Sequence, residues 1–205
     1  MAELELGTDL GVIYKNRPVK PSSRRRTAGG GVAIVYNKNK FRLKERRIVG
    51  NNFELVCAKG KMEGFHNTVL IAGLYVQPRM TVSQWTDLKS MIADLILQEK
   101  AASSNPVILI GGDMNRRDLG PAFEDFDDIT EVVHGPTRGT EKLDKTFTNF
   151  DTDMATTFVC EPLQAVEGIK SDHNCIVSQF CKERFRPCYW QVKSCLLYTS
   201  DAADE

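Results

Sequence analysis

The sequence lacks several features that would assign it to a special class of protein. No apolar run approaches the length of a membrane-spanning helix, and the N-terminus carries no secretory signal peptide. The six cysteines include no C-x-x-C pair and no zinc-like spacing, and the chain has no internal repeats. We therefore expect a soluble intracellular protein, nuclear or cytoplasmic, with reduced thiols, no disulfides and no membrane association.

What the chain does contain is typical of one globular domain. Its 205 residues are 41% hydrophobic and 26% charged, which allows a sizeable core. The formal net charge is zero, but residues 15–47 hold twelve Lys or Arg against one acid, Glu45. Residues 118–131 hold six acids and no base. A basic face suits a polyanion, although the arginines at 24–26 are equally typical of a solvated loop.

The stretch 107–115, Val-Ile-Leu-Ile-Gly-Gly-Asp-Met-Asn, organises the predicted fold. Its apolar start favours a strand buried on both faces, and the two glycines permit a sharp turn at the end of that strand. In an extended chain Asp113 and Asn115 would point to one side, where they could handle a water or a metal together with a phosphate oxygen. The alternative is a strand followed by a simple Asx turn.

Other segments supply the remaining secondary structure. A helix is predicted to begin at Thr81, because Gln84 completes a capping box and apolar residues follow at helical spacing. Apolar or alternating runs predict strands at 12–14, 32–36, 53–59, 67–76, 155–160 and 174–180. A strand, a helix and a strand in succession form a crossover unit, so we expect an α/β fold.

Four more signals carry chemistry. Tyr75 stands at a strand end just before a proline, and the turn at 135–138 carries a hydroxyl and a guanidinium. Asp144 lies inside an apolar-flanked run. Asp172 and His173 lead into a strand, and an imidazole there can serve as acid or base near neutral pH. Asp144 is the available carboxylate to hold the tautomer of that imidazole.

Taken in order, Y-x-x-P, G-D-x-N, P-T-R, L-D and S-D-H resemble the endonuclease/exonuclease/phosphatase superfamily, whose fold is shared by DNase I and exonuclease III. The resemblance runs from about residue 29 to 180 and looks closest to the endonuclease domain of non-LTR retrotransposon polyproteins, where a reverse transcriptase follows. It implies a DNase I-like four-layer α/β sandwich, two packed mixed β-sheets with outer helices, over residues 1–180 with the first strand missing. Residues 181–194 would begin a linker. Residues 195–205 resemble a translated sequencing adapter and are expected to lie outside the domain.

The resemblance also implies a reaction, the nicking of DNA to leave a 3′-hydroxyl primer. His173 would act as general base or orient the attacking group, held by Asp144. Asp113 would position or deprotonate the water. Asn115 and Tyr75 would hold the scissile phosphate and stabilise its developing charge.

A divalent metal, Mg²⁺ or in its place Mn²⁺, is implied as cofactor. Asp172 and an N-terminal glutamate would bind it, with Glu3 the first candidate and Glu5 the second. Thr137 and Arg138 would bind substrate.

Two other functions fit the same residues. One is a phosphatase or phosphodiesterase of the same fold that acts on lipid or inositol phosphates, against which the basic segment argues mildly. The other is a catalytically decayed remnant that binds nucleic acid without cleaving it.

Overall fold

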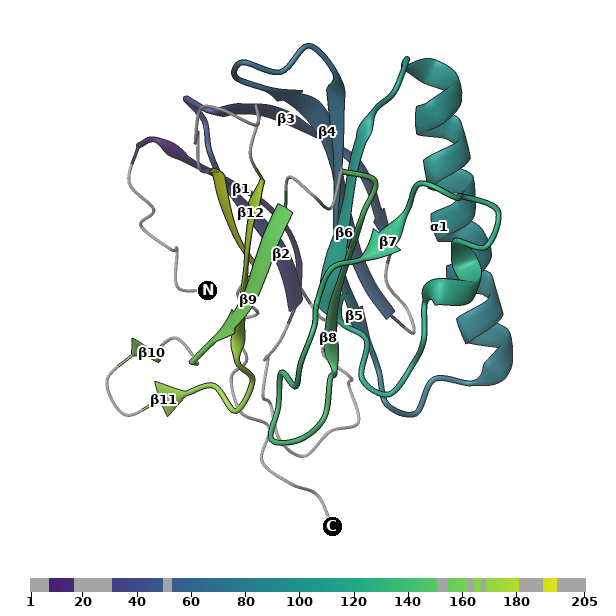
Figure 1. The fold of residues 1–205 in the computed structure, drawn as a ribbon, viewed down its shortest axis with the longest axis vertical. Helices are drawn as coiled ribbons and strands as arrows, with labels where there is room; N and C mark the ends of the chain where they lie inside the picture. The colour runs from purple at the N-terminus through teal and green to yellow at the C-terminus, as the bar shows by residue number, and fades with distance from the viewer. Residues whose placement is uncertain are drawn as a thin grey trace.

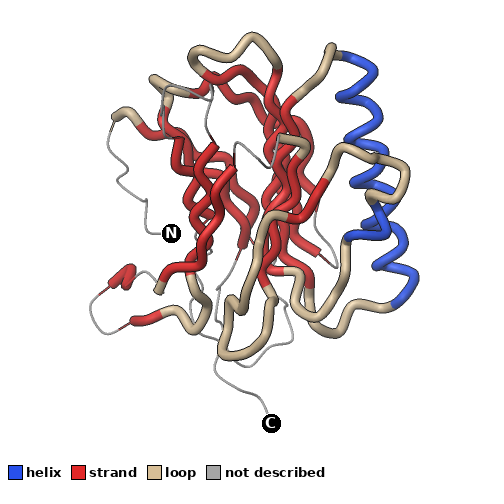
Figure 2. Tube along the Cα trace, viewed as in Figure 1, coloured by secondary structure: helices blue, strands red, loops and turns tan. Residues whose placement is uncertain are grey.

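A computed structural model describes residues 8–16, 31–49, 53–150, 155–161, 164–166, 169–180 and 190–194. A six-stranded sheet runs through the middle of the molecule, with smaller sheets on one side and a long helix on the other (Figure 1). The same three layers are distinguished by secondary structure in Figure 2. Glu3, Glu5 and residues 195–205, on which predictions were made, lie outside the described residues.

The central sheet has the strand order β3-β4-β5-β6-β8-β7. Its strands are β3 (Phe41–Val49), β4 (Phe53–Met62), β5 (Thr68–Val76), β6 (Val107–Asp113), β7 (Thr130–Glu131) and β8 (Asp144–Thr148). Only the β5–β6 pair of this sheet is parallel, as the predicted crossover requires. Strand β3 was not predicted, because every second residue of its first half is charged. It forms the edge of the sheet, where such a pattern is tolerated.

The crossover between β5 and β6 is the helix α1 (Val82–Ala102). The capping box is confirmed: the Gln84 amide donates to the Thr81 hydroxyl at 3.3 Å, and the Thr81 amide donates to the Gln84 side chain at 2.9 Å. The apolar face of α1 packs on the central sheet, with Leu88 and Ile96 fully buried. A short 3-10 helix, η1 (Gly120–Ala122), contacts α1.

Smaller sheets lie on the other side of the central sheet (Figure 1). Their strands are β1 (Leu10–Asn16) with β2 (Gly31–Asn37), β9 (Ala155–Cys160) with β12 (Cys175–Phe180) and β13 (Trp190–Ser194), and β10 (Gln164–Val166) with β11 (Ile169–Lys170). Val32 and Ile34 of β2 pack with Val56 and Ala58 of β4 in a second core. The predicted pair of packed sheets is confirmed. Within the described residues, α-helix covers only the outer face of the central sheet.

Candidate active site

The site begins with a row of side chains across the central sheet. Tyr75 of β5 pairs with Asp113 of β6, and Asp113 pairs with Asp144 of β8. Directly paired residues on neighbouring strands point their side chains to the same face. Because β5 and β6 both end here, the row lies at the edge of the sheet where ligands of α/β proteins bind.

Gly112, immediately before Asp113, allows the chain to reach the site in this conformation. Gly112 has φ +149°, and a Cβ there would lie 1.8 Å from the carbonyl oxygen of Leu74 on the neighbouring strand. The side chain of Asp113 is 3% exposed, so its carboxylate stands in a nearly dry environment.

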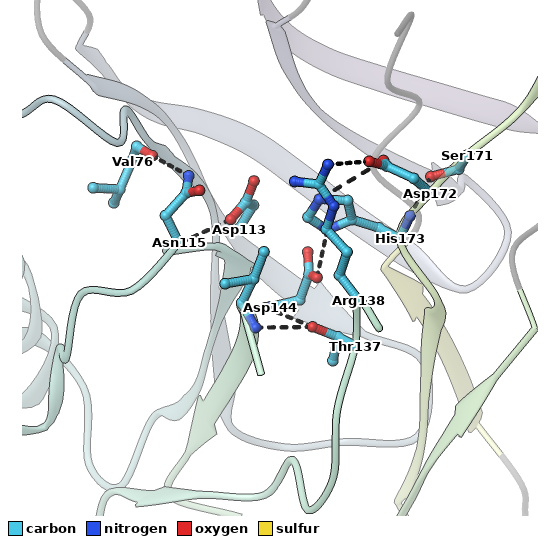
Figure 3. Close-up of polar contacts among 10 residues, drawn as sticks. Val76, Asp113, Asn115, Thr137, Arg138, Asp144, Ser171, Asp172 and His173 are labelled. Carbon is cyan, nitrogen blue, oxygen red and sulfur yellow. Dashed lines mark hydrogen bonds and ion pairs between the residues drawn. The ribbon is translucent and has the colours of Figure 1, made fainter. Parts of the chain in front are cut away.

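Asn115 does not continue the strand in an extended conformation. Its φ is +50°, and its amide N–H donates to Asp113 Oδ1 at 2.7 Å, which makes an Asx turn. The Asn115 side-chain amide donates to the carbonyl of Val76 at 2.7 Å (Figure 3). Of the two geometries that the sequence allowed, the structure therefore has the Asx turn and not the extended chain. Asparagine tolerates this left-handed conformation better than most residues.

His173 and Asp144 form a buried polar contact between two side chains of the site. His173 Nδ1 lies 2.7 Å from Asp144 Oδ2, and both side chains are 8% exposed. The hydrogen bond to Asp144 raises the pKa of His173, and the negative charges of Asp144, Asp113 and Asp172 add to this against the effect of burial. When the carboxylate accepts Nδ1–H, Nε2 is the ring nitrogen through which the histidine would act on a substrate or water.

Thr137 holds Asp144 in position. Its hydroxyl oxygen accepts the backbone N–H of Leu143 at 3.0 Å and that of Asp144 at 2.9 Å, and the residue is fully buried. The Thr137 carbonyl accepts the N–H of Asn174 at 2.6 Å, which ties this turn to the segment that carries His173. Thr137 was predicted as a substrate-binding residue, and in the structure its hydroxyl positions the β8 end of the site.

Arg138 and Asp172 form an ion pair at the exposed rim of the site (Figure 3). Their side chains are 50% and 58% exposed, respectively. Asp172 Oδ1 also lies 4.0 Å from Nε2 of His173. The predicted metal ligand and the predicted substrate-binding guanidinium therefore neutralise each other in this structure, and the metal ligand Asp172 lies near Nε2 of the histidine.

The sequence interpretation missed Glu54, the next member of the row. Glu54 of β4 pairs with Tyr75 and is only 2% exposed. A carboxylate this deeply buried is uncommon outside functional sites and ion-pair networks. An acid inside the apolar run Phe53–Cys57 was the available signal, but alternation in a half-buried strand accounted for it equally well.

The structure brings together all but one of the predicted site residues. Glu3 lies outside the described residues, and the described part of the chain holds no cluster of three or more His, Cys, Asp or Glu suited to a metal. Mg²⁺, however, is usually held by one or two carboxylates together with water and substrate phosphate. The exposed carboxylate of Asp172 at the rim fits that donor set.

Comparison with solved structures identifies the architecture. The chain is similar to a TDP2 structure from Caenorhabditis elegans (TM-score 0.60, 14% identity, 83% of this chain and 75% of that one). It is also similar to TDP2 of D. rerio complexed with a single-strand DNA product (0.56, 13%, 82% and 75%). An endonuclease/exonuclease/phosphatase family protein from Bacteroides thetaiotaomicron matches at 0.54, with 12% identity and 83% and 74% coverage. The fold is that of this family.

A fourth similar structure is a mannosyl-6-phosphatase from Bacteroides thetaiotaomicron (TM-score 0.54, 13% identity, 83% of this chain and 76% of that one). The fold therefore occurs in hydrolases of more than one kind of phosphate ester, and identities this low establish the fold alone. No protein-family model and no curated protein matches the sequence. Among the described residues, no helix is long and apolar enough to cross a membrane.

Proposed function

We propose that this chain hydrolyses phosphodiester bonds in DNA, as the nicking endonuclease domain of a non-LTR retrotransposon polyprotein with a reverse transcriptase downstream. The observation that carries the proposal is the His173–Asp144 pair, placed beside Asp113 and Tyr75 at one edge of the sheet. This set offers a proton carrier, a carboxylate and a phenol around one exposed rim, as hydrolysis of a phosphate ester requires.

In the proposed reaction a water oxygen attacks phosphorus and the bond from phosphorus to the 3′ oxygen breaks. Asp113 positions the water and takes its proton. The raised pKa of His173 widens the pH range over which the ring is protonated, and in that form Nε2–H orients and neutralises the phosphate. The leaving 3′ oxygen ends as a hydroxyl, with its proton supplied from solvent.

The remaining polar groups bind and orient the phosphate. Tyr75 and Asn115 donate hydrogen bonds to phosphate oxygens as charge develops on them. Arg138 exchanges its partner when substrate arrives, from Asp172 to a phosphate of the DNA, and a guanidinium suits either anion. This exchange releases the Asp172 carboxylate at the moment when the phosphate is in place.

A divalent cation, Mg²⁺ or Mn²⁺, completes the proposed site, with Asp172 as one ligand and Glu3 or Glu5 as the second. When bound, the cation would neutralise charge on the phosphate and on the leaving oxygen. Arg138 competes for Asp172, so we expect the metal to bind more tightly with substrate than without it.

A plasmid nicking assay tests the proposal. The chain should convert supercoiled DNA to open circles with Mg²⁺, and the nicked ends should prime a DNA polymerase without prior phosphatase treatment. His173→Ala should abolish nicking, whereas His66→Ala, a change outside the site, should not. Equal nicking by the wild type and His173→Ala would refute the assignment. Salt-sensitive DNA binding with no cleavage in any divalent metal would instead indicate the decayed remnant.

The phosphatase alternative draws support from the similar mannosyl-6-phosphatase structure. It predicts release of inorganic phosphate from a sugar or inositol phosphate at a higher kcat/KM than cleavage of DNA. Measuring both substrates with the same preparation separates the two functions.

A further inference from the structure

A second charged surface lies on the outer edge of the central sheet. It is formed by residues of β3 and β4 that point to the side of the sheet on which α1 packs, and we name it the β3–β4 basic face: Arg42, Lys44, Arg46, Lys59 and Lys61. Arg42, Lys44 and Lys61 are exposed, so α1 leaves this part of the sheet uncovered.

Among the residues that the structure describes, one carboxylate forms ion pairs with this surface. Glu99 of α1 is 1% exposed and contacts Lys59 at 2.6 Å and Arg46 at 3.3 Å. It anchors one end of the face to the helix. Within the described residues, neither Arg42 nor Lys61 forms an ion pair.

The register places like charges opposite each other. Arg42 pairs directly with Lys61, and Lys44 pairs with Lys59. Like charges in directly opposed positions of an antiparallel pair destabilise the sheet. Lys59 is compensated by Glu99, whereas no acid of the described residues forms an ion pair with Arg42 or Lys61. A local arrangement that costs stability without a structural gain is a mark of a functional surface.

The basic face cannot contact the phosphate in the active site. Lys61 pairs with Thr68 at the start of β5, whereas Tyr75 lies at its end, seven residues on. At ~3.3 Å per residue the two ends are about 23 Å apart. The basic face also lies on the side of the sheet on which α1 packs, since Arg46 and Lys59 contact Glu99, whereas Tyr75 packs against the second core on the opposite side. A ligand of the basic face therefore cannot be the same phosphate that occupies the active site.

We propose that the β3–β4 basic face is a second nucleic-acid-binding surface that contacts the phosphate backbone without base specificity. This proposal rests on the proposed function only for the choice of nucleic acid as the polyanion. The exposed cations themselves are part of the structure without any ligand. Alternate residues of a strand lie on one face, so Arg42 and Lys44 form a row along which a phosphate backbone can run. The surface would hold DNA or RNA while the active site remains available to its target.

The test measures binding and needs no hydrolysis. Fluorescence anisotropy of a labelled duplex is recorded in EDTA over ~50–200 mM KCl for the wild type and for Arg42→Gln/Lys61→Gln. Loss of two phosphate contacts should reduce the slope of log K against log salt by about 1.8. The matched control Lys15→Gln/Lys89→Gln removes the same charge from β1 and α1 and should leave the slope unchanged.

A second variant separates binding from folding. Lys61→Glu places an acid opposite Arg42, so its Tm should equal or exceed that of the wild type while DNA affinity falls further than in Lys61→Gln. All variants should hydrolyse bis(p-nitrophenyl) phosphate at the wild-type rate.

An unchanged salt slope in Arg42→Gln/Lys61→Gln overturns the proposal. So does a loss of affinity for phosphatidylserine vesicles with DNA binding intact, which would assign the face to a membrane. If no variant hydrolyses any phosphodiester but the slope still falls, the proposed function fails and the second surface stands.

Discussion

Asp144→Asn tests the central contact of the site. Asparagine keeps the volume of the side chain and an oxygen to accept Nδ1–H, but it removes the negative charge 2.7 Å from His173. A buried hydrogen bond to a charged group contributes about 2 kcal/mol, which corresponds to a Tm lower by ~4–8 °C for a chain of this size. The hydrogen bond to Asp144 is the largest cause of the raised pKa of His173, so that pKa should fall in the variant.

The direction of the pH effect follows from the raised pKa. A histidine whose pKa is higher in the folded than in the unfolded state stabilises the fold fully below its unfolded pKa of about 6.5. That contribution is lost as the pH rises through the folded pKa. The Tm difference between the wild type and Asp144→Asn should therefore be larger below the unfolded pKa of His173 than above its folded pKa.

NMR and kinetics together measure these effects. The chain has three histidines, so His66→Gln/His134→Gln leaves His173 as the single imidazole signal to titrate. Asp144→Asn should lower kcat by about 10²–10⁴, the usual contribution of a positioned acid or base. An identical titration midpoint for His173 with and without Asp144 would refute the reasoning, whatever the loss of activity.

Three further substitutions probe other parts of the site. Gly112→Ala should lower the free energy of unfolding by more than ~3 kcal/mol, as measured by urea denaturation. The added Cβ would lie 1.8 Å from a backbone oxygen, and alanine would have to adopt a positive φ. Arg138→Gln should raise KM for DNA about tenfold, as measured by steady-state kinetics. It should also tighten metal binding to the free protein, as measured by calorimetry, because Asp172 loses its partner. An unchanged Kd for the metal would contradict the exchange of partners. Glu54→Gln should lower kcat about tenfold through Tyr75, so the double variant with Tyr75→Phe should lose less than the product of the single losses.

Elements that are specified by a few neighbouring residues could be predicted from the sequence. The capping box at Thr81 marks the start of α1, and the apolar run ending in two glycines marks β6. Asp113, Asp144 and His173 were identified by motif order, and the structure brings them together. The Asx turn at Asn115 was one of two readings that the residues allowed, and the positive φ there decides between them.

The parts that the sequence did not reveal depend on pairing between distant segments. Strand β3 has the composition of a solvated loop until its pairing with β4 is known. Glu54 becomes part of the site only through its register with Tyr75, twenty-one positions later in the chain. Strand register is set by tertiary packing and turn geometry, which no short stretch of sequence contains.

The sign of the charge opposite Asp113 depends on the register in which β8 pairs with β6. Asp144 faces the site, and its neighbour Lys145 points to the opposite face, where its ammonium donates to the carbonyl of Arg117 at 2.7 Å. A slip of β8 by one residue would exchange the two, because side chains alternate with a period of two. A carboxylate would then be replaced by an ammonium, and the histidine would face a like charge. Insertion or deletion of one residue within β8 should therefore invert the electrostatics of the site while the sheet itself can still form.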